Sequence, residues 1–508
     1  MLAKTETVAL IGTEAHLVQV EVDVGAGVPR FSIVGLPTTT VREAEQRTRS
    51  ALESSGLRWP RQRMVANLAP GGLRKDGTHF DVPLALGIAA ADKRIMQEPL
   101  EGWISIGELA LDGSVRPVRG ALAAALACRS SGRKGLICPA ANAAEAALVE
   151  DIEVVAVTNL CQCIDFFKGK WTPPTPATAP ESNPAPPEDM SDIRGQTMAK
   201  RALEVAAAGG HNLLMLGPPG AGKTMLAKAL PGILPVMTPE ESLEVTNVYS
   251  VAGMLAGNPG LIRRRSFRMP HPHISLAGLI GGGTGLARPG EVSLAHHGVL
   301  FLDEVTLFRR EVLDSLRGPS EEGFVRIARS GGLVCFPCRF ALIAAANPCP
   351  CGYRADTRRA CECSEAQLRT YDAKLSGPLQ DRIDIQIHLP RLGRADLLGA
   401  PHGEASASIR QRVESARCVQ LARYGSPLTT NASASMEEFA GAVVLQPTSR
   451  KILGDRIEEG ELTGRGLSRL LRVARTLADL EQVDVVGDDH IIAALDLKIL
   501  SEGSEVAA

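Results

Sequence analysis

The stretch from Leu213 to Thr224 combines residue types that bind phosphate. A short apolar run, typical of a buried strand, leads directly into G-x-x-x-x-G-K-T, and helix-forming residues follow. Glycines let successive backbone N–H groups wrap around a phosphate, the lysine supplies a positive charge, and the threonine hydroxyl binds Mg²⁺. The predicted nucleotide-binding residues are Gly217, Pro218, Pro219, Gly220, Ala221, Gly222, Lys223 and Thr224.

Two carboxylates follow a second apolar run, Gly298–Leu302. A central parallel strand is buried on both faces, so its first charged residues mark the sheet edge where a site begins. Asp303 is expected to join Thr224 in holding Mg²⁺, and Glu304 to orient the water that attacks a γ-phosphate. Two acids that merely end an ordinary strand are the alternative, which the phosphate-binding motif upstream disfavours.

A third apolar run, Phe340–Ala346, ends at Asn347-Pro348. The Asn347 amide can hydrogen-bond a γ-phosphate or the attacking water, and an Asn-Pro turn of the backbone does not exclude that role. We therefore expect ATP and Mg²⁺ as cofactors, with Lys223, Glu304 and Asn347 as catalytic residues.

Four cysteines in two C-x-C pairs follow this third run. Four thiolates can close a tetrahedral Zn²⁺ site, although C-x-C is less diagnostic than C-x-x-C. Cys335 and Cys338 form a rival pair in a predicted hairpin before the third run, and reduced core thiols are the plain alternative. The predicted zinc ligands are Cys349, Cys351, Cys361 and Cys363.

Length and composition limit the class of protein that positions these residues. A chain of 508 residues predicts about two to four domains, and its 44% hydrophobic and 22% charged residues are ordinary for a globular protein. The net charge of −2 gives no overall field toward nucleic acid or lipid, so any DNA contact must be local. Without a long apolar run or a secretory signal, we expect a cytoplasmic protein with no membrane contact. The eleven cysteines are too few for a disulfide scaffold.

Composition and periodicity divide the chain into four parts. Residues 1–171 are predicted to form an α/β unit, with a strand of alternating valines over 18–24 and a helix over 41–54. Residues 172–190 are predicted to be a proline-rich linker. Residues 191–390 form the α/β core with a parallel sheet. Residues 391–508 predict an all-α unit with helices over 405–424, 435–443, 448–459, 466–482 and 488–500.

The N-terminal part resembles the Lon-protease-like (S5-like) domain of the DNA-repair ATPase RadA and of magnesium-chelatase-like ATPases. The resemblance lies in Asn67–Pro70, in Lys75–Gly77, in Asp81–Ala85 and in Ile106–Val118. His79 and Leu122 stand where active Lon proteases have serine and lysine, so no acyl-enzyme chemistry is available. The resemblance implies a role in assembly or DNA contact. An unrelated α/β domain is the alternative.

The remaining motifs make nearly the whole chain similar to the YifB/ComM group of magnesium-chelatase-like AAA+ ATPases. They include Phe267–His273, Gly281–Gly283, Pro289–Gly298 and Leu375–Asp384. The chain departs from the group at His271-Pro272-His273, where Pro-His-His is usual, and at His297, where Asn is frequent. The resemblance implies a hexameric ring ATPase of the helix-2-insert clade, with a helical lid and an association with DNA branch migration during natural transformation.

Several roles follow from this resemblance alone. It implies that Arg382 is an arginine finger for a neighbouring subunit, with an ion pair to Asp381 or Asp384 as the alternative. It makes Arg465 a lid contact to the γ-phosphate, with Arg469 as competitor. It also places the Ile193–Gln196 segment near the adenine.

The resemblance also assigns a place for DNA. It implies that two insertions, 263–285 and 325–332, line a pore and track DNA phosphates, whereas solvated basic loops are the alternative. Two other functions stay open. One is remodelling of a protein partner in the manner of a chelatase subunit. The other, ATP-dependent proteolysis, is disfavoured because the serine and the lysine are missing.

Overall fold

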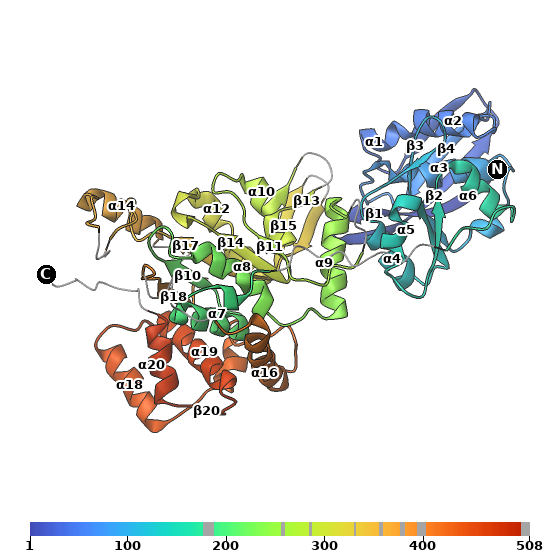
Figure 1. The fold of residues 1–508 in the computed structure, drawn as a ribbon. Coiled ribbons are helices and arrows are strands. Elements are labelled where there is room, and N and C mark those ends of the chain that lie inside the picture. Colours follow the sequence, from blue (N-terminus) through green and yellow to red (C-terminus); the bar gives the residue numbers. More distant parts are fainter. Residues whose placement is uncertain are drawn as a thin grey trace.

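The computed structural model of the chain describes residues 1–175, 187–255, 260–283, 287–329, 332–354, 359–375, 382–393 and 403–498 (Figure 1). Within these ranges the chain is mixed α/β, with a parallel sheet in its central part. Most of the predicted linker lies outside the described residues, as do 376–381 and 499–508. None of the helices in the described ranges is long and apolar enough to cross a lipid bilayer.

The N-terminal unit is built on a seven-stranded mixed sheet in the order β3-β4-β2-β1-β5-β8-β9. Every second residue of β2 faces the core because side chains alternate along a strand, so the valines predicted to alternate are buried. The strands are β1 (Leu2–Ile11), β2 (Glu14–Gly25), β3 (Arg30–Val34), β4 (Arg63–Ala69), β5 (Trp103–Ser105), β8 (Gly135–Pro139) and β9 (Glu153–Val157).

The helices of this unit depart from the prediction at one point. The helix expected over 41–54 is two helices, because Glu43 adopts a shallower turn with ψ of −16° and ends the first of them. The unit contains α1 (Thr39–Arg42), α2 (Ala44–Ser54), α3 (Asp81–Ala91), α4 (Ala121–Ser130), α5 (Ala140–Ala146) and α6 (Leu160–Phe167).

The central unit is built on a five-stranded parallel sheet in the order β11-β14-β17-β10-β18. Helices α7 (Thr197–Gly209) and α8 (Lys223–Ile233) bury their apolar residues in its core. Because β17 lies between β14 and β10, the carboxyl ends of these three strands meet at one edge of the sheet. The strands are β11 (Phe267–Arg268), β14 (Gly298–Leu302), β17 (Phe340–Ala346), β10 (Leu213–Leu216) and β18 (Ile385–His388).

The C-terminal unit shares one hydrophobic core with the central unit. The buried His211 links the two, with Nε2 2.8 Å from Thr476 Oγ1. The prediction of an all-α unit is wrong in one detail, because β19 (Val444–Leu445) pairs in parallel with β20 (Val485–Val486). The helices are α16 (Ser406–Tyr424), α17 (Met436–Ala440), α18 (Pro447–Glu458), α19 (Gly464–Leu480) and α20 (Asp488–Asp496), the last ending before its predicted boundary.

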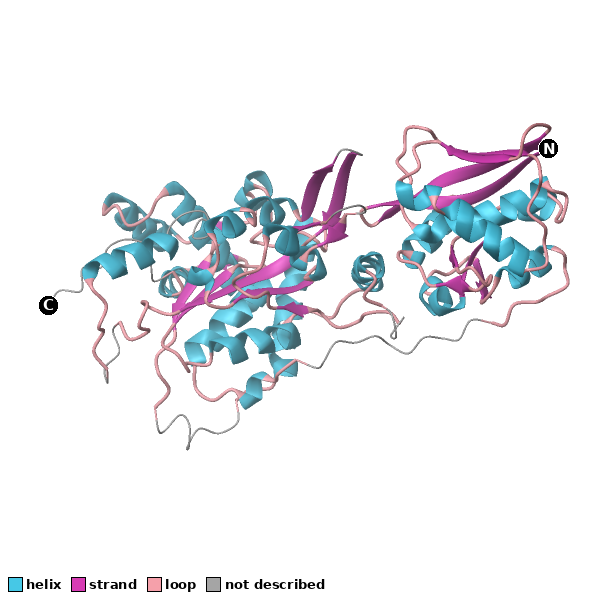
Figure 2. Ribbon diagram, turned by 90° about the horizontal axis from the view of Figure 1, so that it is seen from above, coloured by secondary structure: helices cyan, strands magenta, loops and turns pink. Residues whose placement is uncertain are grey.

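The N-terminal and central units meet at α9 (Pro239–Ala252) and at the hairpin of β15 (Phe324–Arg329) and β16 (Gly332–Pro337). Asn247 Nδ2 donates to the carbonyl oxygen of Thr13 at 2.9 Å, in the turn between β1 and β2. An apolar cluster seals the contact: Leu10, Ala123, Val251, Ala287 and Phe336. Figure 2 shows the hairpin standing out from the central unit beside the tip of the β1–β2 ribbon.

Candidate nucleotide and metal sites

The loop after β10 has the backbone shape that its glycines predict. Gly220 and Gly222 lie in the left-handed region, with φ of +78° and +90°. Gly217 is needed for space instead, because a Cβ there would lie 2.8 Å from the carbonyl oxygen of Leu389. Helix α8 begins at Lys223 directly after this turn, so its first N–H groups point toward any anion held by the loop.

Lys223 ties the loop to the end of β17. Its ammonium donates to the carbonyl oxygens of Gly217 at 2.6 Å and Pro218 at 3.1 Å, and to Asn347 Oδ1 at 3.0 Å. Burial lowers the pKa of the Lys223 ammonium, while the nearby carboxylates of Asp303 and Glu304 act in the opposite direction. Lys223 and Asn347 were predicted from the ends of two different strands, and the structure brings them into direct hydrogen-bonding contact.

Thr224 and Asp303 form the second contact across the loop. Thr224 Oγ1 donates to Asp303 Oδ2 at 3.0 Å, and the backbone N–H of Glu304 donates to Asp303 Oδ1 at 3.0 Å. A hydroxyl and a carboxylate side by side are oxygen ligands of the kind that Mg²⁺ prefers, so the residues fit the predicted ion. Glu304 is exposed and adopts a left-handed backbone, with φ of 48° and ψ of 50°, where the chain turns away from β14.

Asn347 is held on two sides. Since the Lys223 ammonium can only donate, Oδ1 faces it, and the amide nitrogen is the group left to donate to a phosphate or water. The backbone carbonyl of Asn347 accepts a hydrogen bond from Tyr371 Oη at 2.9 Å, and Thr306 Oγ1 donates to the same hydroxyl at 3.2 Å. Sequence reasoning missed Tyr371 and Thr306, since neither lies in a motif; Tyr371 belongs to the polar helix α14 (Glu365–Leu375).

The Gln196 side chain links the phosphate-binding loop to the chain after β18. Its Nε2 donates to the carbonyl oxygens of Ala221 at 3.0 Å and Pro390 at 2.9 Å, and its backbone is left-handed with φ of +54°. The Ile193–Gln196 segment, expected near an adenine, thus contacts the phosphate-binding loop directly through Gln196.

Two predicted arginines lie in other parts of the chain. Arg382 pairs with Glu321 of α13 (Arg317–Glu322), and Asp384 instead accepts from the backbone N–H of Asn212 at 3.3 Å. Arg382 therefore forms an ion pair within its own chain, as the alternative expected, but with Glu321 in place of Asp384, and Asp381 lies outside the described residues.

Arg465 is exposed in the first turn of α19, in the C-terminal unit. Its competitor Arg469, one turn later, donates to the carbonyl oxygen of Ile383 at 3.1 Å. Arg469 therefore contacts the central unit just before β18.

The first insertion predicted to track DNA holds two of its arginines in ion pairs. Arg265 contacts Glu241 at 3.0 Å and donates to the carbonyl oxygens of Pro235 and His297. Arg268 forms a bidentate pair with Glu291, at 2.6 and 2.7 Å. Both arginines are held by carboxylates of their own chain, while 284–286 and 330–331 lie outside the described residues. In the second insertion, the exposed Arg326 lies over the Phe324 ring and contacts Glu322 at 3.1 Å.

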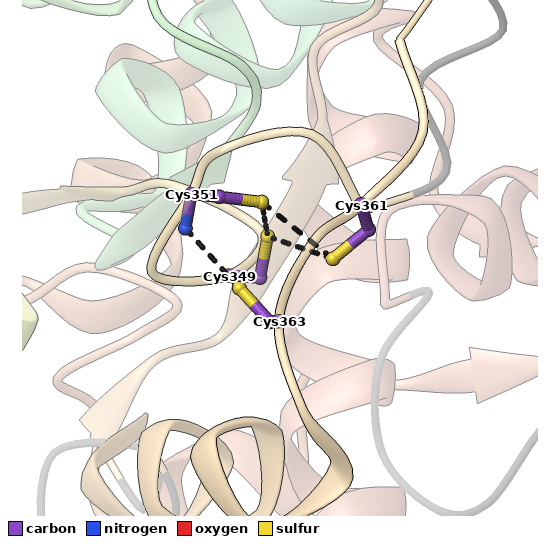
Figure 3. Close-up of side chains that lie close together, drawn as sticks. All are labelled: Cys349, Cys351, Cys361 and Cys363. Carbon is purple, nitrogen blue, oxygen red and sulfur yellow. Dashed lines mark hydrogen bonds between the residues drawn. The ribbon is translucent and has the colours of Figure 1, made fainter.

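The four predicted zinc ligands come together after Asn347 (Figure 3). Cys349 Sγ lies 3.3 Å from Cys351 Sγ and 3.7 Å from Cys361 Sγ, and the last two are 3.6 Å apart. Cys363 Sγ accepts from the backbone N–H of Cys351 at 3.4 Å. The rival pair does not converge in this way, because Cys335 is exposed on the hairpin while Cys338 is buried.

Comparisons with known proteins identify the family of the chain. Three family models match successive parts of the chain: "Subunit ChlI of Mg-chelatase" over residues 20–142, "Magnesium chelatase, subunit ChlI" over 189–397, and "Magnesium chelatase, subunit ChlI C-terminal" over 403–498.

Similar full-length proteins come from several bacteria. An uncharacterized protein of Mycobacterium tuberculosis is 42% identical over 98% of both chains. The competence protein ComM of Haemophilus influenzae is 40% identical over 97% of this chain and 96% of its own. The YifB protein of Escherichia coli is 38% identical over 98% and 97%. The chain therefore belongs to the YifB/ComM family of magnesium-chelatase-like proteins.

Proposed function

We propose that this protein is an AAA+ ATPase that assembles into a ring, with six subunits as the expected number, and uses ATP hydrolysis to move on DNA. The observation that carries the proposal is the meeting of Lys223, Thr224, Asp303 and Asn347 at three adjacent strand ends. Four side chains from three separate segments, each suited to a different part of Mg-ATP, are difficult to explain as structural contacts alone.

Each residue has a distinct task in this proposal. The N–H groups of the loop and the start of α8 hold the phosphates, and Lys223 neutralises charge on the β and γ oxygens. Thr224 and Asp303 hold Mg²⁺, which when bound offsets the charge of the leaving phosphate. Glu304 orients the attacking water, and the amide nitrogen of Asn347 donates to that water or to the γ-phosphate.

Arg382 and Arg465, which lie outside the phosphate-binding loop, would complete the nucleotide site. Arg382 is anchored in its own chain by Glu321, and its buried Nε has no hydrogen-bond partner among the described residues. We assign it to the γ-phosphate of the neighbouring subunit, where a planar, always-charged donor stabilises the transition state. Arg465 would close over the γ-phosphate from the helical C-terminal lid.

DNA is the proposed track for this motor. A relative that is 40% identical carries the name competence protein ComM, and Arg326 in strand β15 is exposed. The N-terminal unit, read as Lon-protease-like, has buried His79 and Leu122 where a serine and a lysine would be needed. It would therefore serve assembly or DNA contact rather than proteolysis, in a cytoplasmic protein.

The test is ATP turnover measured alone and with single-stranded, duplex and four-way-junction DNA. Stimulation by DNA is the expected result, and stimulation by junctions above all would support branch migration. Turnover that no DNA changes would contradict the DNA part. It would favour the second candidate, remodelling of a protein partner, which the match to magnesium-chelatase subunit models supports.

A further inference from the structure

We infer that the four thiols after Asn347 bind one Zn²⁺ ion, and that this ion braces the nucleotide site, so that metal occupancy controls ATP turnover. Metal binding stands on the geometry of the cysteines alone. The effect on turnover rests on the proposed ATPase function.

The spacing of the sulfur atoms matches a mononuclear site. Zinc–sulfur bonds of about 2.3 Å at tetrahedral angles place neighbouring sulfurs about 3.8 Å apart. Cys349, Cys351 and Cys361 show separations of 3.3–3.7 Å, and Cys363 completes a set whose ligand atoms all lie within 4.8 Å of one another. An iron–sulfur cluster inserts its own atoms between the ligands and needs a wider opening.

The backbone around the cysteines is arranged for thiolates. The N–H of Arg354 donates to Cys349 Sγ at 3.3 Å, and the N–H of Cys351 donates to Cys363 Sγ at 3.4 Å. Such donors stabilise negative sulfur and commonly support metal ligands from outside the coordination shell.

The described part of this segment has little apolar packing to hold it. Of its described residues from 350 to 354 and from 359 to 364, only Gly352 is buried. A loop with so little core needs another source of order, and a bound metal supplies it because the binding free energy becomes folding free energy.

The same segment touches the nucleotide site at two points. Gly352 packs so closely that an added Cβ would lie 2.8 Å from Pro219 Cδ of the phosphate-binding loop. Cys349 follows Asn347 by two residues, and the Asn347 carbonyl is held by Tyr371 from the helix that continues after Cys363. The metal would therefore fix the chain directly after Asn347 and the chain leading into the helix that holds the Asn347 carbonyl, with the cysteines acting as positioning residues.

The first experiment measures metal in the purified full-length protein by elemental analysis. We expect about one zinc per chain in the wild type and almost none in the Cys361→Ser/Cys363→Ser variant. Cys335→Ser/Cys418→Ser, which removes two exposed thiols elsewhere, is the matched control and should keep its zinc. A wild type without metal after incubation with zinc, with all four thiols alkylated in the folded protein, would overturn the inference. Bound iron in place of zinc would overturn the identity of the ion.

The second experiment tests the link to the nucleotide site while the ligands stay intact. Gly352→Ala should keep its zinc and bind ADP within about threefold of wild type, yet hydrolyse ATP at least about tenfold more slowly, because the displaced segment begins just after Asn347. Gly56→Ala is the control: Gly56 has a similar φ of +78° but nothing within 4 Å of an added Cβ. Normal turnover in Gly352→Ala would contradict the link.

Hydrogen exchange gives a readout that does not depend on activity. In the zinc-free cysteine variant, amides from 344 to 354 should exchange faster than in the wild type, while those of β2 remain unchanged. Unchanged exchange would overturn the bracing role. If the wild type hydrolyses no ATP, the proposed function fails, but metal content and exchange still decide this inference.

Discussion

At the scale of single residues, the account depends on Lys223. Its ammonium bonds three oxygens that belong to the loop and to Asn347. Removing it should leave the loop without the charge that holds β and γ oxygens. Lys223→Ala is expected to weaken ATP binding by at least about a hundredfold, measured by titration with a fluorescent nucleotide.

The matched control is Lys228→Ala, one turn further along α8. Lys228 is exposed and contacts Glu188 at 3.5 Å, away from the loop. Equal loss of binding in both variants would indicate a general defect in α8 and would refute the role of Lys223.

Glu304 is expected to act on water rather than on binding. Glu304→Gln keeps the size of the side chain but removes the negative charge that orients and polarises the water. We expect ATP binding to persist while turnover falls at least about a hundredfold, measured by single-turnover hydrolysis. A variant that hydrolyses ATP at the normal rate would exclude Glu304 from catalysis.

The Tyr371 hydroxyl is expected to position Asn347. Tyr371→Phe removes the hydrogen bonds to the Asn347 carbonyl and from Thr306, which should cost about 1 kcal/mol of stability and slow ATP turnover several-fold. Tyr424→Phe also loses one hydroxyl contact, to Asn431, but in the C-terminal unit, so it should leave turnover unchanged. The two rates under saturating ATP decide between a positioning role and a merely structural one.

Much of this site could be predicted from the sequence because the end of an apolar run marks the end of a buried strand. Lys223, Asp303 and Asn347 each come where an apolar run stops, and parallel strands bring such ends to one edge. Tyr371 and Gln196 could not be found in this way. Their contacts depend on how segments far apart in the sequence pack together, and no local sequence pattern predicts this packing.

At the scale of elements, the β1–β2 hairpin and the short η1 helix (Thr78–Phe80) bury a neutral histidine. Burial lowers the pKa of the His79 imidazole to about 4, and its contact with the Val8 carbonyl at 2.8 Å offsets this only in part. The imidazole therefore binds a proton more readily in the unfolded chain. Its contribution to stability is complete above about pH 6.5 and is lost as the pH falls toward 4, by about 1.4 kcal/mol per pH unit.

His79→Gln should reduce the loss of stability between about pH 6.5 and 5. The measurement is urea unfolding followed by tryptophan fluorescence, which reports this unit selectively because all three tryptophans, Trp59, Trp103 and Trp171, lie in it. His16→Gln, on the exposed part of the same hairpin, is the control and should keep the wild-type pH dependence. Equal slopes in all three proteins would refute the assignment.

Periodicity predicted most elements but not their interruptions. The alternating valines of β2 and the apolar runs of β10, β14 and β17 are where the pattern places them. The break at Glu43 and the pairing of β19 with β20 were missed. The first is a change of one torsion angle, and the second depends on a partner about forty residues away, as the register Val444 with Val485 shows.

At the scale of the whole molecule, the proposal requires that each nucleotide site be completed by a neighbour. Arg382 is held by Glu321 of its own chain, on a different element from the phosphate-binding loop. Arg382→Ala should therefore leave ATP binding within about threefold of wild type while lowering turnover by about a thousandfold. An equal loss of binding would place Arg382 in its own chain's site instead.

The central claim, hydrolysis at a seam between identical subunits, is tested most directly by mixing two inactive variants. Lys223→Ala lacks a working loop but carries Arg382, and Arg382→Ala lacks the finger but carries the loop. Equal co-assembly of the two should restore about one quarter of the wild-type ATP turnover, since about one seam in four then joins an intact loop to an intact finger. A mixture no more active than either variant alone would contradict the account.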